Sequence, residues 1–260
     1  MDYLASQEHQ LATCGGISAY SVMRSVQDSG QAMGYAVLST RGLARNIDAM
    51  SKLLLETFDR LRLDEWSRIS QILGQIRSRK VLGVVQNAHS LALLAASGAW
   101  SRLSSMNHQL SGLGSLAQYD DWCRRVEHGD VAQLHDSLTL LHSQLTSSRR
   151  SALVIADPSE LSYASSSLTE AYPTWAEMAM PIFQVEEELL PKAQAFFVST
   201  QANFAAACIP CVREKHPDSA PLTILARLLS QQYLHPVLRE QGGAYGAVSY
   251  THLTLPTILP

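Results

Sequence analysis

The sequence is poor in charge, in cysteine and in long apolar runs. Its 260 residues hold 20 Lys and Arg against 23 Asp and Glu, and only 17% of all residues are charged, where an average soluble protein has about 25%. No basic field is present to hold a nucleic-acid backbone, so we expect no nucleic-acid partner. No apolar run approaches the roughly 18 residues of a spanning helix, and the N-terminus carries no signal peptide, so we expect no membrane partner. Four scattered cysteines favour a reducing compartment over a disulfide scaffold.

Motifs that would hold a metal or a nucleophile are also missing. Neither HExxH nor HxxEH occurs in the sequence, and no GxSxG elbow is present. Cys208 and Cys211 have the spacing of a redox or zinc pair, but no second pair exists to complete a zinc tetrahedron. We interpret both as small buried hydrophobes, and we predict no metal ligand in this chain.

Hydrophobic periodicity predicts a first α/β unit over residues 1–156. Apolar residues spaced by three and four from Leu43 to Leu61 indicate one amphipathic helix. Asp64 is expected to cap a second and longer helix that continues to Ala96, before a polar break over 101–114. Asp130 is expected to open a third helix. The expected strands are Cys14–Val26, Ala32–Ser39 and Arg150–Ala156.

A second unit is predicted over residues 179–260, after a linker at 157–178 that has little periodicity. Its helix starts at Asp218, where Pro221 suits a first turn, and ends at the Gly242-Gly243 pair. Together the two units predict an α/β protein of the two-layer α+β type. The expected strands of the second unit are Ala193–Thr200, Asn203–Val212 and Ala244–Tyr250.

One segment, residues 239–246, has an unusual combination of residues. Arg239 and Tyr245 lie six residues apart, on either side of Gly242 and Gly243, where the predicted helix passes into a strand. One interpretation is an ordinary helix C-terminus, where a cation offsets the helix dipole and the glycines make the turn. The other is a binding site, where glycines let the backbone approach a bound chain while guanidinium and phenol donate hydrogen bonds to a carbonyl or oxyanion. Local chemistry leaves both open.

The stretch HPDSAPLTILARLLSQQYLHPVLREQGGAYGA, residues 216–247, closely resembles the last domain of the presequence proteases. These enzymes are a branch of the pitrilysin/insulinase family of zinc metallopeptidases. The upstream chain, from Thr13-Cys14-Gly15-Gly16-Ile17 to RSALVIA at 150–156, is similar to the third domain of the same enzymes. The resemblance implies the third domain and the beginning of the fourth domain of a clamshell peptidase.

The resemblance also implies a function. In that family the zinc and its HxxEH ligands lie in the first domain, so zinc is expected in the full-length enzyme and not in this chain. Arg239 and Tyr245 match the family's Arg and Tyr pair, which holds the substrate backbone and stabilises the tetrahedral intermediate. Gly242 and Gly243 would then contact the substrate. The implied partners are peptide substrates and the zinc-bearing N-terminal half, and the fragment alone is expected to be inactive.

Two other functions stay open. The chain could be a non-catalytic subunit that pairs with a separate zinc-bearing chain, or a free peptide-binding module. Residues 249–260 do not resemble the family's continuation, and we expect a non-native tail there. We also expect missing N-terminal strands, an exposed sheet edge and an uncovered helix face. Bacterial cytoplasm is the default compartment, with an organellar matrix open if the N-terminus is truncated.

Overall fold

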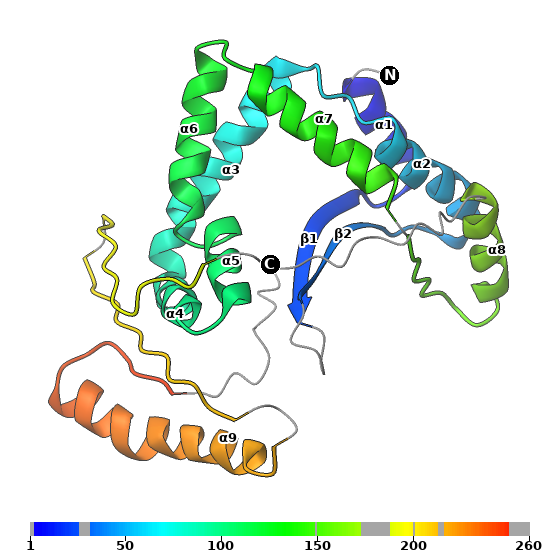
Figure 1. Ribbon diagram of the computed structural model, residues 1–260. Helices are drawn as coiled ribbons and strands as arrows, with labels where there is room; N and C mark the ends of the chain where they lie inside the picture. Colours follow the sequence, from blue (N-terminus) through cyan, green and yellow to red (C-terminus); the bar gives the residue numbers. More distant parts are fainter. Residues whose placement is uncertain are drawn as a thin grey trace.

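The computed structural model describes residues 3–25, 32–148, 150–172, 188–199, 201–212 and 216–249, and these are mostly helical (Figure 1). The helices and strands are α1 (Tyr3–Thr13), β1 (Ile17–Ser25), β2 (Ala32–Thr40), the short 3₁₀ helix η1 (Ala44–Asn46), α2 (Ile47–Asp59), α3 (Trp66–Gln86), α4 (Ala88–Gly98), α5 (Arg102–Leu110), α6 (Ser115–Glu127), α7 (Ala132–Thr146), α8 (Leu161–Ala171), α9 (Ser219–Leu228) and η2 (Leu229–Gln241).

Strands β1 and β2 form an antiparallel ribbon in which Ile17 pairs with Thr40 and Tyr20 with Val37. The chain enters the ribbon through Gly16, whose φ of 109° is a conformation that L side chains rarely adopt. The Thr40 hydroxyl donates to the carbonyl of Gly16 at 3.0 Å, which joins the start of β1 to the end of β2 at one end of the ribbon. Both strands were predicted from the sequence. Among the described residues no third strand joins them.

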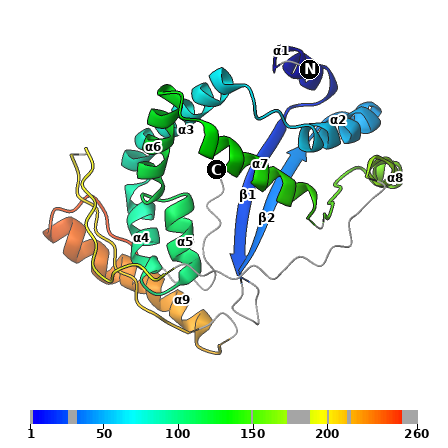
Figure 2. The same ribbon diagram turned by 45° about the horizontal axis from the view of Figure 1, so that its top comes forward.

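The helices associate in pairs that lie side by side in both ribbon views (Figures 1 and 2): α3 with α6, α4 with α5, and α2 with α8. Helix α2 forms where the apolar stripe predicts it and buries Ile47 and Leu53. Helix α8 lies inside the predicted linker 157–178. It packs on α2 through a hydrogen bond from the Tyr163 hydroxyl to Asp48 at 2.6 Å. The predicted division into domains stays a prediction.

The long helix expected from residue 64 to Ala96 is instead two helices. Helices α3 and α4 meet at Asn87 with a bend of 94°. The Asn87 side chain donates to the carbonyl of Gly83 at 3.3 Å, beside the backbone bond to the same oxygen, and such side-chain competition favours a helix end. Within the described residues, no single helix has the length and apolar content to cross a membrane. Among the described helices, only the bent pair of α3 and α4, taken together, has both the length and the apolar content.

Two expectations about helix starts were wrong. Asp64 does not cap α3, because its carboxylate pairs with Arg62 at 3.2 Å and the N-cap position is Glu65. The segment 101–114, expected as a polar break, contains α5. The Ser101 hydroxyl accepts a bond from the Ser104 amide at 3.3 Å and caps that helix, which is the usual role of serine at this position.

The strands predicted at 150–156, 193–200, 203–212 and 244–250 do not form in the described part of those ranges, while Thr200 and Tyr250 lie outside it. In the first of them, Leu153 is 85% and Ile155 is 89% exposed. A strand needs a neighbouring strand to satisfy its backbone groups, and local sequence does not supply one. The α/β fold expected from the sequence is therefore corrected to a mostly helical fold with a two-stranded sheet.

Candidate functional site

Arg239 lies in the last turn of a continuous helix made of α9 and η2. Pro221 is the third residue of α9. At this position a backbone N–H would have no carbonyl partner within the helix, so proline loses no hydrogen bond there. From Leu229 onward the helix winds more widely as a π-helix, and this stretch contains Pro236. A proline ring crowds the carbonyl of the preceding turn and donates no hydrogen bond, which the wider winding accommodates.

The helix ends at Gly242, as the sequence predicted. The Gly242 amide donates to the carbonyl of Val237 at 2.9 Å, and the Ala244 amide donates to that of Leu238 at 2.8 Å. A Cβ atom at Gly242 would lie 2.8 Å from the Leu238 carbonyl oxygen, too close for any side chain. Gly243 follows with φ of +70°, in the left-handed region. Both glycines are therefore required by the turn itself.

After this turn the chain runs back along the helix and presents Tyr245 to solvent. Tyr245 is 98% exposed, two residues beyond Gly243. The returning segment is held at its far end, where the hydroxyl of buried Ser230 donates to the carbonyl of Ser249 at 2.8 Å. The segment is extended but pairs with no strand in the described chain.

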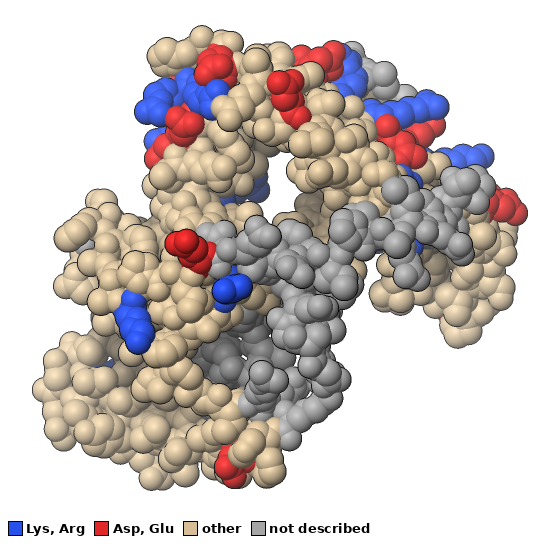
Figure 3. Space-filling model, viewed as in Figure 1, with Lys and Arg blue, Asp and Glu red and all other residues tan. Residues whose placement is uncertain are grey.

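The structure thus places Arg239 and Tyr245 at the same end of one helix, both exposed. Among the described residues, neither side chain has a hydrogen-bond or ion-pair partner. Glu240 lies between them in the sequence, and its Oε1 atom is 3.3 Å from Nδ1 of His235. The apolar stripe of the same helix is largely open to solvent at Leu225, Leu228, Leu229 and Tyr233, the uncovered helix face that we expected. On the face shown in Figure 3, few charges lie near α9, whereas many lie toward α2 and α6.

The cysteine pair does not form a reactive site here. Cys208 is half-buried and Cys211 is exposed, so the expectation that both are buried hydrophobes was wrong. Both carry free thiols, in a segment without strand pairing in the described chain. Burial raises the pKa of the Cys208 thiol, and the neighbouring Cys211 raises it further, which disfavours the thiolate that metals and nucleophilic chemistry need. Nowhere in the described ranges do three or more His, Cys, Asp or Glu side chains gather as a metal would require.

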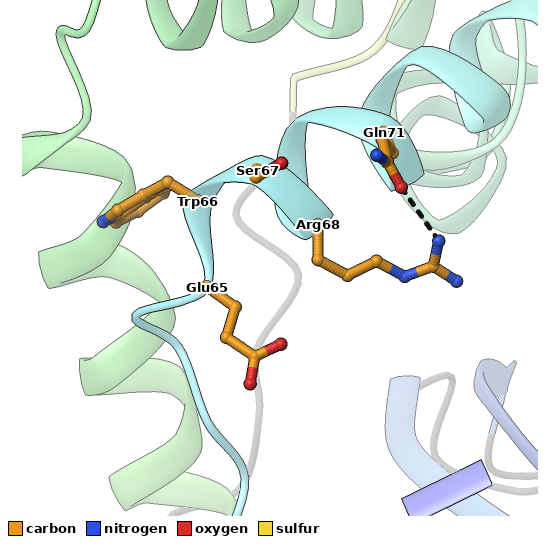
Figure 4. A pocket seen from close by; sticks show the side chains of 5 residues that line it. All are labelled: Glu65, Trp66, Ser67, Arg68 and Gln71. Atoms are coloured by element: carbon orange, nitrogen blue, oxygen red, sulfur yellow. Dashed lines mark hydrogen bonds between the residues drawn. The ribbon is translucent and has the colours of Figure 1, made fainter. Parts of the chain in front are cut away.

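An open pocket of about 430 Å³ lies at the start of α3, lined by Glu65, Trp66, Ser67, Arg68 and Gln71 (Figure 4). Its charged groups already have partners. Arg68 donates to the Gln71 side chain at 3.1 Å, and Glu65 pairs with Arg62 at 2.8 Å. Trp66 packs against His135 with ring centroids 5.9 Å apart. These contacts hold the α3 start in place, and they engage both charged groups of the pocket.

Sequence reasoning missed a buried polar cluster between α5 and α6. Ser104, Ser105, His108 and Ser115 are each at most 2% exposed. Lys80 of α3 donates to the Ser115 hydroxyl at 2.9 Å. Nδ1 of His108 and the hydroxyl of Ser104 are buried without a hydrogen-bond partner among the described residues. The periodic spacing of serines and histidine on α5 was the available signal, but polar residues at core positions do not stand out in a hydrophobic pattern.

Comparison with known proteins shows what this chain is similar to. Residues 1–120 match the family described as associated with peptidases of metallopeptidase family sixteen, subfamily C. The chain is 25% identical to the mitochondrial presequence protease of Drosophila melanogaster over 252 residues. This alignment covers 95% of this chain and 24% of that protein. The chain is a relative of the presequence proteases.

Two fungal presequence proteases agree with this relationship. The mitochondrial protein of Schizosaccharomyces pombe is 26% identical over 265 residues, with 94% of this chain and 25% of that protein covered. The protein of Emericella nidulans is 30% identical over 187 residues, with 69% of this chain and 18% of that protein covered. The resemblance to presequence proteases read from the sequence is therefore confirmed. The chain spans about a quarter of the length of these relatives.

Proposed function

We propose that this chain supplies substrate-binding and intermediate-stabilising groups to a zinc-dependent oligopeptidase that degrades presequence-like and other unstructured peptides. In this proposal it corresponds to the third domain and the beginning of the fourth domain of a clamshell peptidase. The described residues contain no group fit to hold zinc, so the proposal assigns the metal to another part of the enzyme. It concerns only what the side chains of this chain do.

The observation that carries the proposal is the exposure of Arg239 and Tyr245 at one helix end. Tyr245 lies just after the turn and is 98% exposed, so its ring has no packing role in this chain. A phenol O–H and a guanidinium are both hydrogen-bond donors to a carbonyl oxygen, and they bind it more strongly once it carries negative charge. Donors placed where charge develops in the transition state accelerate the reaction without tightening substrate binding.

Gly242 and Gly243 have a complementary role in this proposal. Gly243 has open space where a Cβ atom would lie, so an extended peptide can approach the backbone there, whereas Gly242 turns that side toward the Leu238 carbonyl and shapes the turn. The turn is held by its own hydrogen bonds to Val237 and Leu238. The donors therefore sit on a preorganised support.

The alternative is a non-catalytic subunit or peptide-binding module that pairs with a separate zinc-bearing chain. The same exposed groups would serve it, since binding a peptide backbone needs the same donors. The partners that we propose are peptides and a metal-bearing half, without nucleic acid or membrane. Of the two compartments that the sequence leaves open, the names of the mitochondrial relatives favour the organellar matrix over the cytoplasm.

The test is Tyr245→Phe in the assembled peptidase, with the metal-bearing part present in the same chain or as its partner. Loss of one oxyanion donor costs about 3 kcal/mol in the transition state, so kcat is expected to fall roughly 100-fold with KM nearly unchanged. Tyr233→Phe is the matched control, because Tyr233 is exposed on the same helix but lies before the turn. A loss confined to KM, or no loss, would overturn the oxyanion role. Retained peptide binding without any effect on turnover would favour the binding module.

A further inference from the structure

Residues 188–196, here called the strap, lie without helix or strand structure on helices α4 and α5. The Leu190 amide donates to the carbonyl of Gly98, the last residue of α4, at 3.0 Å. The hydroxyl of buried Ser105 on α5 donates to the carbonyl of Glu188 at 2.7 Å. Both bonds join segments that are more than 80 residues apart in the chain. The strap is therefore held by its backbone on a surface built by the two helices.

Side chains add three further contacts. Leu190 packs over Gly98, where an added Cβ would lie 2.5 Å from its Cδ1 atom and would displace that methyl group. The Lys192 ammonium stands over the Trp100 ring at 5.0 Å, a favourable cation–π contact. At the end of the strap, Phe196 packs on His108 with ring centroids 5.4 Å apart.

His108 is the unusual member of this contact. It is 2% exposed, and its Nδ1 has no partner among the described residues. The ring is enclosed from the side of α6 by the backbone at Gly112 and Gly114, where added Cβ atoms would lie 3.1 Å from Nδ1 and 3.0 Å from Cδ2. The apolar Phe196 closes it from the strap. Burial lowers the pKa of His108, because a charged imidazolium loses its hydration in this setting.

The charged side chains on the elements packed around this histidine make their contacts elsewhere. Lys80, from α3, is hydrogen-bonded to Ser115 and carries the same charge that His108 would gain. Lys192, from the strap, is also positive and lies over Trp100. Glu188 meets the helices through its backbone carbonyl. No described carboxylate forms an ion pair with His108.

We propose that His108 and the strap form a pH-sensitive latch, closed while the imidazole is neutral and released when it takes up a proton. A protonated ring needs water or a counter-ion, and movement of Phe196 away from the ring opens it to water. Release is therefore coupled to uptake of one proton. The strap precedes the part of the chain that carries α9 and η2. This inference does not depend on the proposed peptidase function.

The direction of the pH dependence follows from the lowered pKa. The released state has the ordinary histidine pKa of about 6.5, and the closed state has a lower one. The latch is therefore at full strength above about pH 6.5 and weakens as the pH falls below it. The weakening continues down to the pKa of the closed state. A single proton changes the equilibrium by at most about tenfold per pH unit.

Amide hydrogen exchange of the 260-residue chain at pH 7.5 and pH 5.5, corrected for the intrinsic rate at each pH, tests the latch. The reporter is the Leu190 amide, which bonds to Gly98. Its protection is expected to fall by up to about tenfold at the lower pH, while protection within α3 and α6 stays constant. A fall of less than twofold overturns the proposal.

Variants separate the histidine from general acid effects. His108→Gln and His108→Phe, which cannot titrate, are expected to abolish the pH response of Leu190. The matched control is His128→Gln, because His128 is exposed and bonds only its own helix through the Arg124 carbonyl; it should leave the response intact. Leu190→Ala is expected to release the strap at both pH values without touching a helix. An unchanged pH response in both His108 variants overturns the role of His108.

Discussion

The Ser230 hydroxyl exchanges two hydrogen bonds with the backbone of Ser249: it donates to the carbonyl at 2.8 Å and accepts from the amide at 2.5 Å. Nineteen residues separate the two serines. This pair holds the returning segment, with Tyr245 on it, against the helix that carries Arg239. One buried side chain thus closes the loop around the candidate site.

Ser230→Ala should free that segment. The change removes both hydrogen bonds, and each contributes about 1 kcal/mol net. The local opening equilibrium is therefore expected to rise roughly 5- to 30-fold, seen as faster hydrogen exchange of the Ser249 amide. Ser147→Ala is the matched control, because Ser147 is bonded only to carbonyls of its own helix, α7. Unchanged exchange at Ser249 in the Ser230 variant would show that other contacts hold the segment.

The turn at Gly243 should tolerate asparagine better than alanine. Its φ of +70° costs an L residue with a Cβ about 1–2 kcal/mol, while asparagine visits this region more readily. Gly243→Ala is expected to speed exchange of the Ala244 amide, which closes the turn on Leu238. The effect of Gly243→Asn should be smaller.

Gly246→Ala is the control for that series. An added Cβ at Gly246 meets nothing within 4 Å, and its backbone φ is not among the positive values. Exchange at Ala244 should stay near that of the native chain. Equal effects of alanine and asparagine at Gly243 would contradict the role assigned to the left-handed turn.

Acid should weaken the docking of α8 on α2. The Tyr163 hydroxyl beside Asp48 holds the pKa of that carboxyl below its ordinary value of 3.8, with smaller help from Ser167 and Lys52. The folded pKa is the lower one, so this contribution is complete above pH 3.8 and is lost as the pH falls through the folded pKa. Tyr163→Phe is expected to return the Asp48 pKa toward 3.8, measured by NMR titration of the carboxyl carbon.

Asp157 is an internal reference for that titration. The amide and hydroxyl of Ser159 lower its pKa within its own turn, without any contact to Tyr163. Its pKa should not change in the Tyr163 variant. A shift of both carboxyls together would indicate a global change in the protein instead of loss of one hydrogen bond.

Local patterns predicted several elements well. The apolar stripe of α2 and the extent of the α9–η2 helix, from its proline in the first turn to its glycine stop, follow from residues within a few turns of each other. Helix α5 was missed, because its inward side chains are serines and a histidine, which a search for apolar spacing passes over. Helix α8 was missed for a similar reason, since its middle is the serine run 165–167.

The sequence by itself determined where the candidate site lies: Arg239, the two glycines and Tyr245 are brought to one helix end by local backbone geometry. Tertiary structure alone decided the rest. Strand pairing joins segments distant in sequence, so Leu153 and Ile155 stayed exposed although their pattern favours a buried strand. The contact of Phe196 with His108 across 88 residues likewise follows from the packing of α4, α5 and the strap. Burial and the lowered pKa of His108 are properties of that packing, and no single segment carries them.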